Sequence, residues 1–203
     1  MLYAQLSALK VSASSLDSVL GHIETEIRTA IERRGGSRGT SLQANTASGE
    51  VVLESFWDSG KAMQESAATG VLTKHSLTGG AESAVVTENY RLAAFEHHGG
   101  AQTGAAVQIT RLSAEPSALD DAIEVFGDTV VPALADMEGF LSAMLLADRD
   151  SGRTIIQSVW LDTAVLRAGR GAPAIQAEAM ATAGCAIRRT DNYGLLYDSA
   201  QLG

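Results

Sequence analysis

The chain has 203 residues, which is enough for one larger domain or for two domains of about 100 residues each. Hydrophobic residues make up 45% and charged residues 19%, a balance typical of a globular protein. The net charge of -9 and the pI of about 4.8 argue against a phosphate-binding surface, so we expect no nucleic-acid partner.

Neither end of the chain nor its apolar stretches indicate a membrane protein. Cys185 is the only cysteine, which excludes an intrachain disulfide and suits a reducing compartment. The first residues, MLYAQLSALK, have no basic segment before an apolar run and so do not predict a signal peptide. No apolar stretch approaches the roughly 18 residues that span a bilayer. We expect a cytoplasmic protein with no membrane partner.

The first half of the chain predicts strands and helices in a simple order. Residues 2–11 alternate and predict a strand, and an apolar stripe with three- and four-residue spacing predicts a helix over 16–31. Two strands, about 38–46 and 49–57, flank a Ser-Gly turn that is typical of a hairpin. An Ala-rich helical stretch at 58–79 and a strand at 83–95 complete this half.

The second half repeats the first at a constant shift of 103 residues, which pairs Gly49 with Gly152 and Trp57 with Trp160. Its predicted strands are 105–113, 140–148, 152–160 and 185–197, with a helix over 119–134 and a helical stretch at 161–182. A chance match would not stay in register over a whole half, so the repeat indicates a duplicated structural unit.

Each half has the strand-helix-strand-strand-helix-strand order of a ferredoxin-like unit. We predict an α+β protein with a first unit at 1–96, a Gly-rich linker at 97–104 and a second unit at 105–203. Both faces of a strand such as Val51–Trp57 are apolar, so the face without helices needs a cover. We therefore expect the two units to pack sheet to sheet, as an internal pseudo-dimer that is monomeric or forms a homodimer. The alternative is two independent domains on a flexible string.

The stretch GFLSAMLLADRDSGRTIIQSVWLDTAVL (139–166) resembles the antibiotic biosynthesis monooxygenase family, and Leu42–Met63 is a weaker echo of it. The resemblance implies the dimeric α+β barrel fold, here as an intrachain version, with a pocket between the sheet and the helices of each unit. Some members of the family oxidise aromatic polyketide-like substrates with dioxygen and without a metal or flavin. Others bind and degrade haem.

The haem-degrading members carry an Asn on the first strand, a Trp at the end of the third strand and a His ligand on the next helix. Here the Trp is present twice, and Gln5 and Gln108 correspond to the Asn. The helix after each Trp has no His in its first turns; His75 comes later, and its counterpart is Glu178. We therefore expect no cofactor, with haem disfavoured.

The strongest candidates for a substrate pocket are the repeated tryptophans. Ser55 lies on the face of Trp57, and Ser158 on that of Trp160, because strand residues two apart point the same way. Such a pair suits a flat aromatic ligand, whereas the alternative is a core tryptophan that closes the end of the sheet.

Further candidates are repeated polar residues on other strands: Gln5, Gln108, Asn89, Asn192, Tyr90 and Tyr193. A buried Gln needs hydrogen-bond partners, which a ligand or a neighbouring strand supplies. Alternation places each Asn and the following Tyr on opposite faces, so at most one of the two lines a given pocket. Packing with the hydroxyl at the rim is the alternative for both tyrosines.

The family resemblance favours an enzyme, a cofactor-independent monooxygenase for a small hydrophobic or aromatic, polyketide-like substrate, with dioxygen as co-substrate. The alternatives are a non-catalytic ligand-binding or scaffold protein of the same fold and, more weakly, a haem-binding or haem-degrading protein. No repeated His, Asp or Glu marks a catalytic base, so the catalytic residues stay unnamed. The adjacent His97 and His98 in the linker lack the spacing of a metal site, and we predict none.

Overall fold

The computed structural model describes residues 1–70, 77, 83–169 and 172–202. The elements of the first half follow the predicted order, and their bounds are β1 (Tyr3–Val11), α1 (Leu16–His22), the π-helix η1 (Ile23–Ile27), α2 (Arg28–Glu32), β2 (Ser37–Asn45), β3 (Glu50–Trp57), α3 (Gly60–Ala68) and β4 (Ser83–His97).

The elements of the second half are β5 (Ala106–Ser113), the 3-10 turn η2 (Pro116–Ala118), α5 (Leu119–Val125), the π-helix η3 (Phe126–Val130), α6 (Val131–Ala135), β6 (Phe140–Ala147), β7 (Arg153–Trp160), α7 (Thr163–Ala168), α8 (Ala172–Thr182) and β8 (Ala186–Asp198). The predicted helical stretch at 161–182 is thus two helices. The one predicted at 58–79 begins as α3, and most of its remainder lies outside the described residues.

The repeat extends to irregular features of the backbone. In both halves one long helix is interrupted by a five-residue π segment, η1 in the first half and η3 in the second. Both bounds of η3 lie 103 residues after those of η1, and the same holds for β7 relative to β3. A π segment is a rare irregularity, so its presence at both matched positions indicates one duplicated fold.

The two hairpins of the repeat turn in the same way. Gly49 and Gly152 both adopt a positive φ, +72° and +74°, which favours glycine. A Cβ atom on Gly49 would lie 2.2 Å from the carbonyl oxygen of Val11, and one on Gly152 would lie 1.9 Å from that of Ala114. The two glycines therefore occupy equivalent places, as the repeat predicts.

The chain forms two compact units: unit 1 is Met1–Asn89 with Leu195–Gly203, and unit 2 is Tyr90–Gly194. In unit 1, β3 pairs antiparallel with β1 and β2; in unit 2, β7 pairs with β5 and β6, while β5 also pairs with β8 and β6 with β4. The long strands β4 and β8 each contribute residues to both units. In hydrogen-bonding order the strands of unit 1 run β1-β3-β2, and those of unit 2 run β8-β5-β7-β6-β4.

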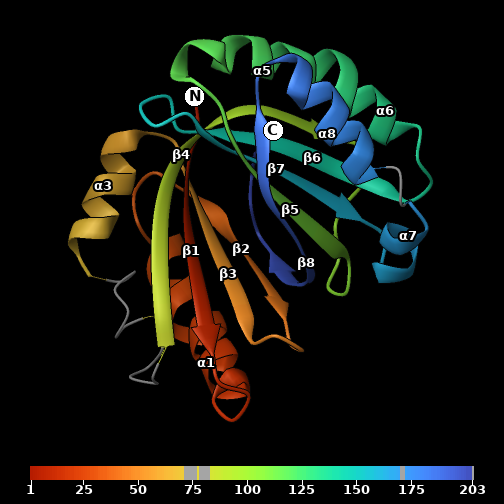
Figure 1. Cartoon of the computed structure of the whole chain (residues 1–203). Coiled ribbons are helices and arrows are strands. Elements are labelled where there is room, and N and C mark those ends of the chain that lie inside the picture. Colours follow the sequence, from red (N-terminus) through yellow and green to blue (C-terminus); the bar gives the residue numbers. More distant parts are fainter. Residues whose placement is uncertain (71–76, 78–82, 170–171, 203) are drawn as a thin grey trace. The chain divides into compact units, whose positions relative to one another are not determined.

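Each unit has a core between its sheet and its helices (Figure 1). In unit 1 the apolar stripe of the long helix, including Val19, Ile23 and Ile31, packs on Leu53 and Trp57 of β3. In unit 2 the core contains the equivalent Ala122, Phe126 and Leu134, and α8 adds Met180. The predicted α+β fold with two ferredoxin-like units is confirmed.

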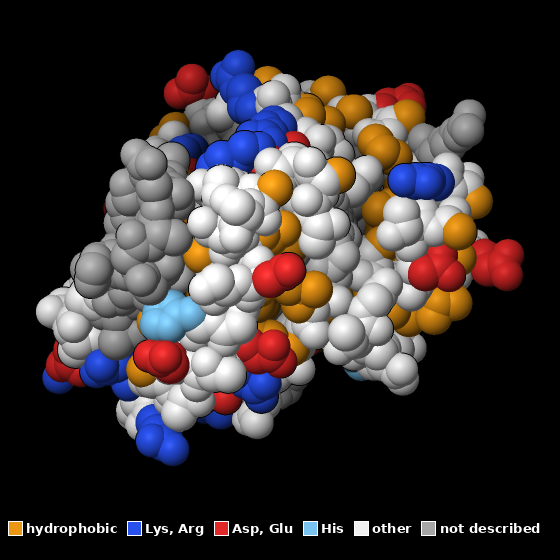
Figure 2. Space-filling model, turned by 90° about the horizontal axis from the view of Figure 1, so that it is seen from below, with side chains coloured by type: hydrophobic (Ala, Val, Ile, Leu, Met, Phe, Trp, Pro, Cys, Tyr) orange, Lys and Arg blue, Asp and Glu red, His pale blue; other side chains and the backbone are white. Residues whose placement is uncertain are grey.

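The helix-free face of each sheet is also apolar and buried. Leu6, Val52 and Phe56 of unit 1 and Ile109 and Ile155 of unit 2 alternate with the helix-facing residues and are at most 1% exposed. Among the described residues, the exposed large hydrophobic side chains are Met1, Val86, Leu161 and Ile187. Figure 2 shows one face of the surface, where charged side chains of both signs occur among uncharged ones. No helix in the described part of the chain is long and apolar enough to cross a membrane.

Candidate functional site

Each unit buries a tryptophan at the end of its third strand and pairs it with a serine. Trp57 Nε1 donates to Ser55 Oγ at 3.1 Å, and Trp160 Nε1 donates to Ser158 Oγ at 3.0 Å. Both indole rings are fully buried and belong to the cores beneath the helices. The indole N–H is therefore satisfied inside the protein, and each hydroxyl is held at the nitrogen edge of the ring.

A glutamine and an asparagine continue this arrangement across the sheet. Gln5 lies opposite Ser55 in the strand register, and its Nε2 donates to Asn89 Oδ1 at 2.8 Å. Gln108 lies opposite both Ser158 and Asn192, and its Nε2 donates to Asn192 Oδ1 at 3.1 Å. Directly opposite residues of antiparallel strands point to the same face, so these side chains share the helix-facing side.

We call this line of side chains across the sheet the polar row. On β2 and β6 it ends at the residue that lies opposite the serine, which is Thr40 in unit 1 and Ala143 in unit 2. The members are Asn89, Gln5, Ser55 and Thr40 in unit 1, and Asn192, Gln108, Ser158 and Ala143 in unit 2.

Each polar row contains one buried acceptor that the described residues do not satisfy. Gln5 and Gln108 are each 3% exposed, and no donor among the described residues bonds their Oε1 atoms. A buried carbonyl without a donor costs about 1–3 kcal/mol, so an unsatisfied acceptor at both matched positions calls for an explanation. A ligand that donates a hydrogen bond is one.

The two repeated tyrosines lie elsewhere. Val107 of β5 lies opposite Tyr193 and is absent from the helix-side core, so Tyr193 faces the other side of the sheet from Asn192. Tyr90 follows Asn89 and by alternation also faces away from the polar row. Both tyrosines are buried. The rows thus bring together six of the ten candidate residues, with each tryptophan bonded to the serine of its row, and leave the tyrosines out.

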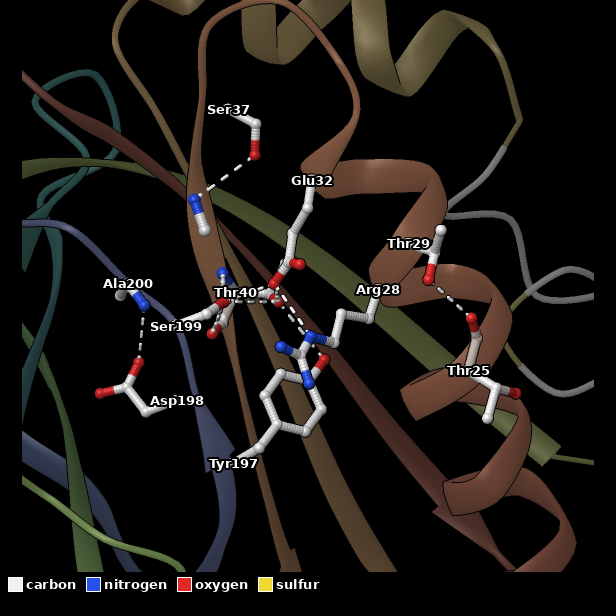
Figure 3. Close-up of polar contacts among 11 residues, drawn as sticks. Thr25, Arg28, Thr29, Glu32, Ser37, Thr40, Tyr197, Asp198, Ser199 and Ala200 are labelled. Atoms are coloured by element: carbon white, nitrogen blue, oxygen red, sulfur yellow. Dashed lines mark hydrogen bonds and ion pairs between the residues drawn. The ribbon is translucent and has the colours of Figure 1, made fainter.

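A cluster around Glu32 adjoins the polar row of unit 1 (Figure 3). Glu32 Oε1 accepts hydrogen bonds from Thr40 Oγ1 at 2.9 Å, from Ser199 Oγ at 2.5 Å and from Arg28 Nε at 3.1 Å. The Arg28 guanidinium lies over the Tyr197 ring, 4.6 Å from its centre. We call these five residues the Glu32 cluster. It joins α2, β2 and the end of the chain.

The environment of the cluster changes the acidity of two of its members. Burial acts to raise the pKa of Glu32, but the hydrogen bonds from Ser199 and Thr40 and the charge of Arg28 prevail and lower it. Burial raises the pKa of Tyr197 to about 12, although the Thr40 hydrogen bond and Arg28 act in the opposite direction. At neutral pH the cluster therefore contains a carboxylate and a neutral phenol.

The repeat gives no signal for this cluster, because the two halves do not share its residues. At the shift of 103 residues, Glu32 is matched by Ala135 and Thr40 by Ala143. The spacing of Arg28 and Glu32, four apart on a helix, is a signal for an ion pair. Nothing in the sequence places Tyr197 and Ser199 beside them, because that proximity depends on where the last strand ends.

In unit 2 the matched region is filled by other side chains. Gln176 of α8 is fully buried and accepts a hydrogen bond from Thr110 Oγ1 at 3.1 Å. Phe140 packs its ring edge-on against Trp160, with the ring centres 5.5 Å apart. In unit 1 the position of Phe140 is taken by Ser37, and that of Gln176 by Thr73, which lies outside the described residues.

Most of the second repeat matches a known family. Residues 105–179 match the antibiotic biosynthesis monooxygenase family. An uncharacterized protein of Mycobacterium tuberculosis is 27% identical over 157 residues, which cover 76% of this chain and 69% of the relative.

Solved structures share the fold at low sequence identity. An anthrone oxidase-like protein superimposes with a TM-score of 0.68 at 15% identity, covering 98% of this chain and 94% of the other. A heme-degrading enzyme from Listeria monocytogenes gives a TM-score of 0.54 at 11% identity, covering 94% and 98%. These similarities show the fold, that of the dimeric α+β barrel.

Proposed function

Since residues 105–179 form a domain of the antibiotic biosynthesis monooxygenase family and the first half repeats that domain, we propose that the protein is a cofactor-independent monooxygenase that acts on a small aromatic substrate. The observation that carries this proposal is the unsatisfied Gln Oε1 atom in each polar row, held beside a buried Trp-Ser pair. A phenolic hydroxyl is the kind of donor that would satisfy it.

The side chains around the row suit a flat, weakly polar ligand. The indole of Trp57 supplies an aromatic surface, and Gln5 is held in place by its bond to Asn89. Ser55 Oγ accepts from the indole N–H, so its own proton is available to an oxyanion that develops on the ligand. Substrate orientation and oxyanion stabilisation are therefore the roles that we assign to the row.

The proposed reaction converts a methylene group next to a phenolic ring into a carbonyl. A base removes one methylene proton, and the carbanion gives one electron to dioxygen. The resulting radical and superoxide combine to a peroxide anion, which takes up a proton. Loss of water, which removes the second methylene hydrogen, leaves the carbonyl. One CH2 group and one O2 thus give one C=O group and one H2O, and the substrate itself supplies the electrons.

Oxygen uptake with anthrone as substrate tests the proposal. We expect uptake by the wild type and a loss of at least tenfold in kcat/KM when the acceptor of the active unit is removed by Gln5→Leu or Gln108→Leu, since a lost hydrogen bond of about 1.5 kcal/mol corresponds to that factor. Gln64→Leu, on the exposed face of α3, is the matched control and should retain wild-type rates. Absence of oxygen uptake with anthrone and with other activated phenols would overturn the enzymatic proposal.

A ligand-binding protein without catalysis is the second candidate, and the packing of unit 2 favours it for that unit. Gln176 and Phe140 occupy space beside the row, and the polar row ends at a methyl group. Calorimetric binding of a phenol without any oxygen uptake would support this alternative.

Haem does not fit the described residues of either row. The groups there are indole, hydroxyl and carboxamide, and none of these is a usual axial ligand of haem iron. The described helices that follow each Trp, α3 and α7, contain no His. His75 lies outside the described residues. We therefore derive no step through haem.

A further inference from the structure

Unit 2 buries a second polar atom without a partner beside the acceptor of its polar row. Among the described residues, no group forms a hydrogen bond with Gln176 Nε2 of α8 or with Gln108 Oε1 of β5. Gln176 is fully buried and Gln108 is 3% exposed. One of the two atoms is a donor and the other is an acceptor. Each is costly to bury unpaired, so a single group that meets both would remove both penalties.

The strand and the helix bring these two side chains next to each other. Thr110 follows Gln108 by two residues on β5, so their side chains share a face and lie about 7 Å apart along the strand. Thr110 Oγ1 donates to Gln176 Oε1 at 3.1 Å, and Thr190 Oγ1 donates to Thr110 Oγ1 at 3.3 Å. The carboxamide of Gln176 is therefore held over β5, next to the side chain of Gln108.

The other side chains that α8 turns to the sheet offer no polar partner. Ala172, Ala179 and Met180 share the buried face of the helix with Gln176 and belong to the core of unit 2, which α8 covers together with α5 and α6 (Figure 1). A direct bond between the two carboxamides would satisfy both, but no such bond joins Gln176 Nε2 to Gln108 Oε1. A bridging group is therefore what the pair requires.

We propose that one buried water molecule bridges Gln108 and Gln176 in unit 2. The water donates to Gln108 Oε1 and accepts from Gln176 Nε2. Ser158 lies directly opposite Gln108, and its Oγ accepts from Trp160 Nε1, so its own proton is available to the water as a third partner. Buried waters make about three hydrogen bonds, typically to polar groups that otherwise lack partners, and this site supplies that number.

Water is the class of ligand that suits the site because the two atoms call for a donor and an acceptor at one point. A space of about 10–15 Å³ is enough for a water. An aromatic ring over Gln108 would have to displace α8 from β5, and the hydrogen bond between Thr110 and Gln176 opposes that movement.

The bridge gives the two polar rows different roles. In unit 2 the water occupies the acceptor of Gln108, so this row fastens α8 to the sheet. Gln5 of unit 1 is then the acceptor left for a substrate, and this consequence rests on the proposed function. The position of Gln176 in the first half is Thr73, so the sequence does not repeat the bridge.

A crystal structure of the whole chain, at a resolution that shows ordered waters, tests the proposal directly. We expect one water within hydrogen-bonding distance of both Gln108 Oε1 and Gln176 Nε2. Gln176→Met conserves the volume of the side chain and should lose this water. Thr154→Val is the matched control and should keep it, because Thr154 Oγ1 is another buried atom of unit 2 without a partner among the described residues. A direct bond between the carboxamides, or side-chain atoms that fill the space between them, would overturn the proposal.

Urea unfolding of Gln108→Met, Gln176→Met and the double variant tests the bridge in solution. Either substitution takes a partner from the water, so the second should cost little more. We expect the product of the two single effects on the unfolding constant to exceed the effect of the double variant by about five- to tenfold.

The control is the same cycle with Gln108→Met and Thr154→Val, whose effects should multiply to within about twofold. Thr154 lies opposite Leu112, four residues along β5 from Gln108, which is about 13 Å away. Independent effects of Gln108→Met and Gln176→Met would overturn the bridge. Both measurements are made without substrate, so a lack of oxygen uptake would contradict the proposed function alone.

Discussion

Units 1 and 2 share the third strand of the repeat and the long helix with its π segment at one constant shift, and they differ in what meets the end of the polar row. Unit 1 places the carboxylate of Glu32 and the guanidinium of Arg28 there, and the matched residues of the second half are Ala135 and Val131. Features that determine the backbone, such as the hairpin glycines, the π segments and the Trp-Ser pairs, are present in both. The comparison teaches that the backbone and the centre of the row are common, whereas the surroundings of the row are specific to one unit.

The tryptophans give the largest expected effect. Trp57→Ala should lower the free energy of unfolding by about 3 kcal/mol and Trp160→Ala by about 4 kcal/mol, because both rings are fully buried and Trp160 also loses its edge-on contact with Phe140. Urea unfolding followed by circular dichroism measures both values. A larger loss for Trp57→Ala would show that unit 1 packs its tryptophan with other groups that compensate.

Substitution of the hairpin glycines should destabilise both units to a similar degree. Gly49→Ala and Gly152→Ala place a Cβ atom in a left-handed conformation and against a backbone carbonyl, which we expect to cost about 2 kcal/mol each. Thermal unfolding of the two variants should show matching shifts in Tm. Clearly unequal shifts would contradict the structural equivalence of the turns.

The stabilities of the two glutamine variants, measured without ligand, compare the two polar rows directly. Gln5→Leu and Gln108→Leu each remove one hydrogen bond and leave the Asn89 or Asn192 carbonyl oxygen without that donor, for a cost of about 1 kcal/mol. In Gln5→Leu the removal of an unsatisfied Oε1 atom offsets part of that cost, whereas Gln108→Leu also removes an acceptor of the proposed water. Gln108→Leu should therefore have the lower denaturant midpoint, and a stabilised Gln5→Leu would support a site kept for binding rather than for stability.

Lowering the pH should reduce the contribution that Glu32 makes to the stability of unit 1. The folded state lowers the pKa of Glu32 below its usual 4.5, so the carboxylate adds stability above that value, and this stability is lost as the pH falls through the folded pKa. Glu32→Gln should remove this dependence. The free energy of unfolding of the wild type should therefore approach that of the variant as the pH falls below 5. The charged neighbour is Arg28, and Tyr197 is neutral in this range. A difference that stays constant with pH would contradict the assignment.

The smallest expected effect concerns the turn of unit 2. Hydrogen bonds from Ser151 and Arg153 lower the pKa of Asp148 although its burial acts to raise it, whereas the matched Asn45 of unit 1 does not titrate. Asp148→Asn should therefore flatten the acid dependence of stability below pH 4 by a small amount, since the turn is largely exposed to solvent. Chemical denaturation at pH 3 and pH 6 measures it, with Gln64→Leu as a control.

Much of the fold and part of the site followed from local patterns in the sequence. Three of these patterns are the alternation of β3, the apolar stripe of the long helix and the turn at Gly49. Each depends on residues near one another in the chain, and each occurs again 103 residues later. The pairing of Trp57 with Ser55 also follows from local spacing, because strand residues two apart share a face. The break between α7 and α8 was not predicted.

The sequence by itself determined the duplicated α+β units and the residues at the centre of each polar row, because periodicity and repetition act within one element or between matched positions. Only the tertiary structure decided that Glu32, Thr40 and Ser199 meet, and that an acceptor of Gln5 is buried without a donor among the described residues. The physical reason is that such contacts join residues up to 167 positions apart, whose proximity depends on where long strands end and which unit they join.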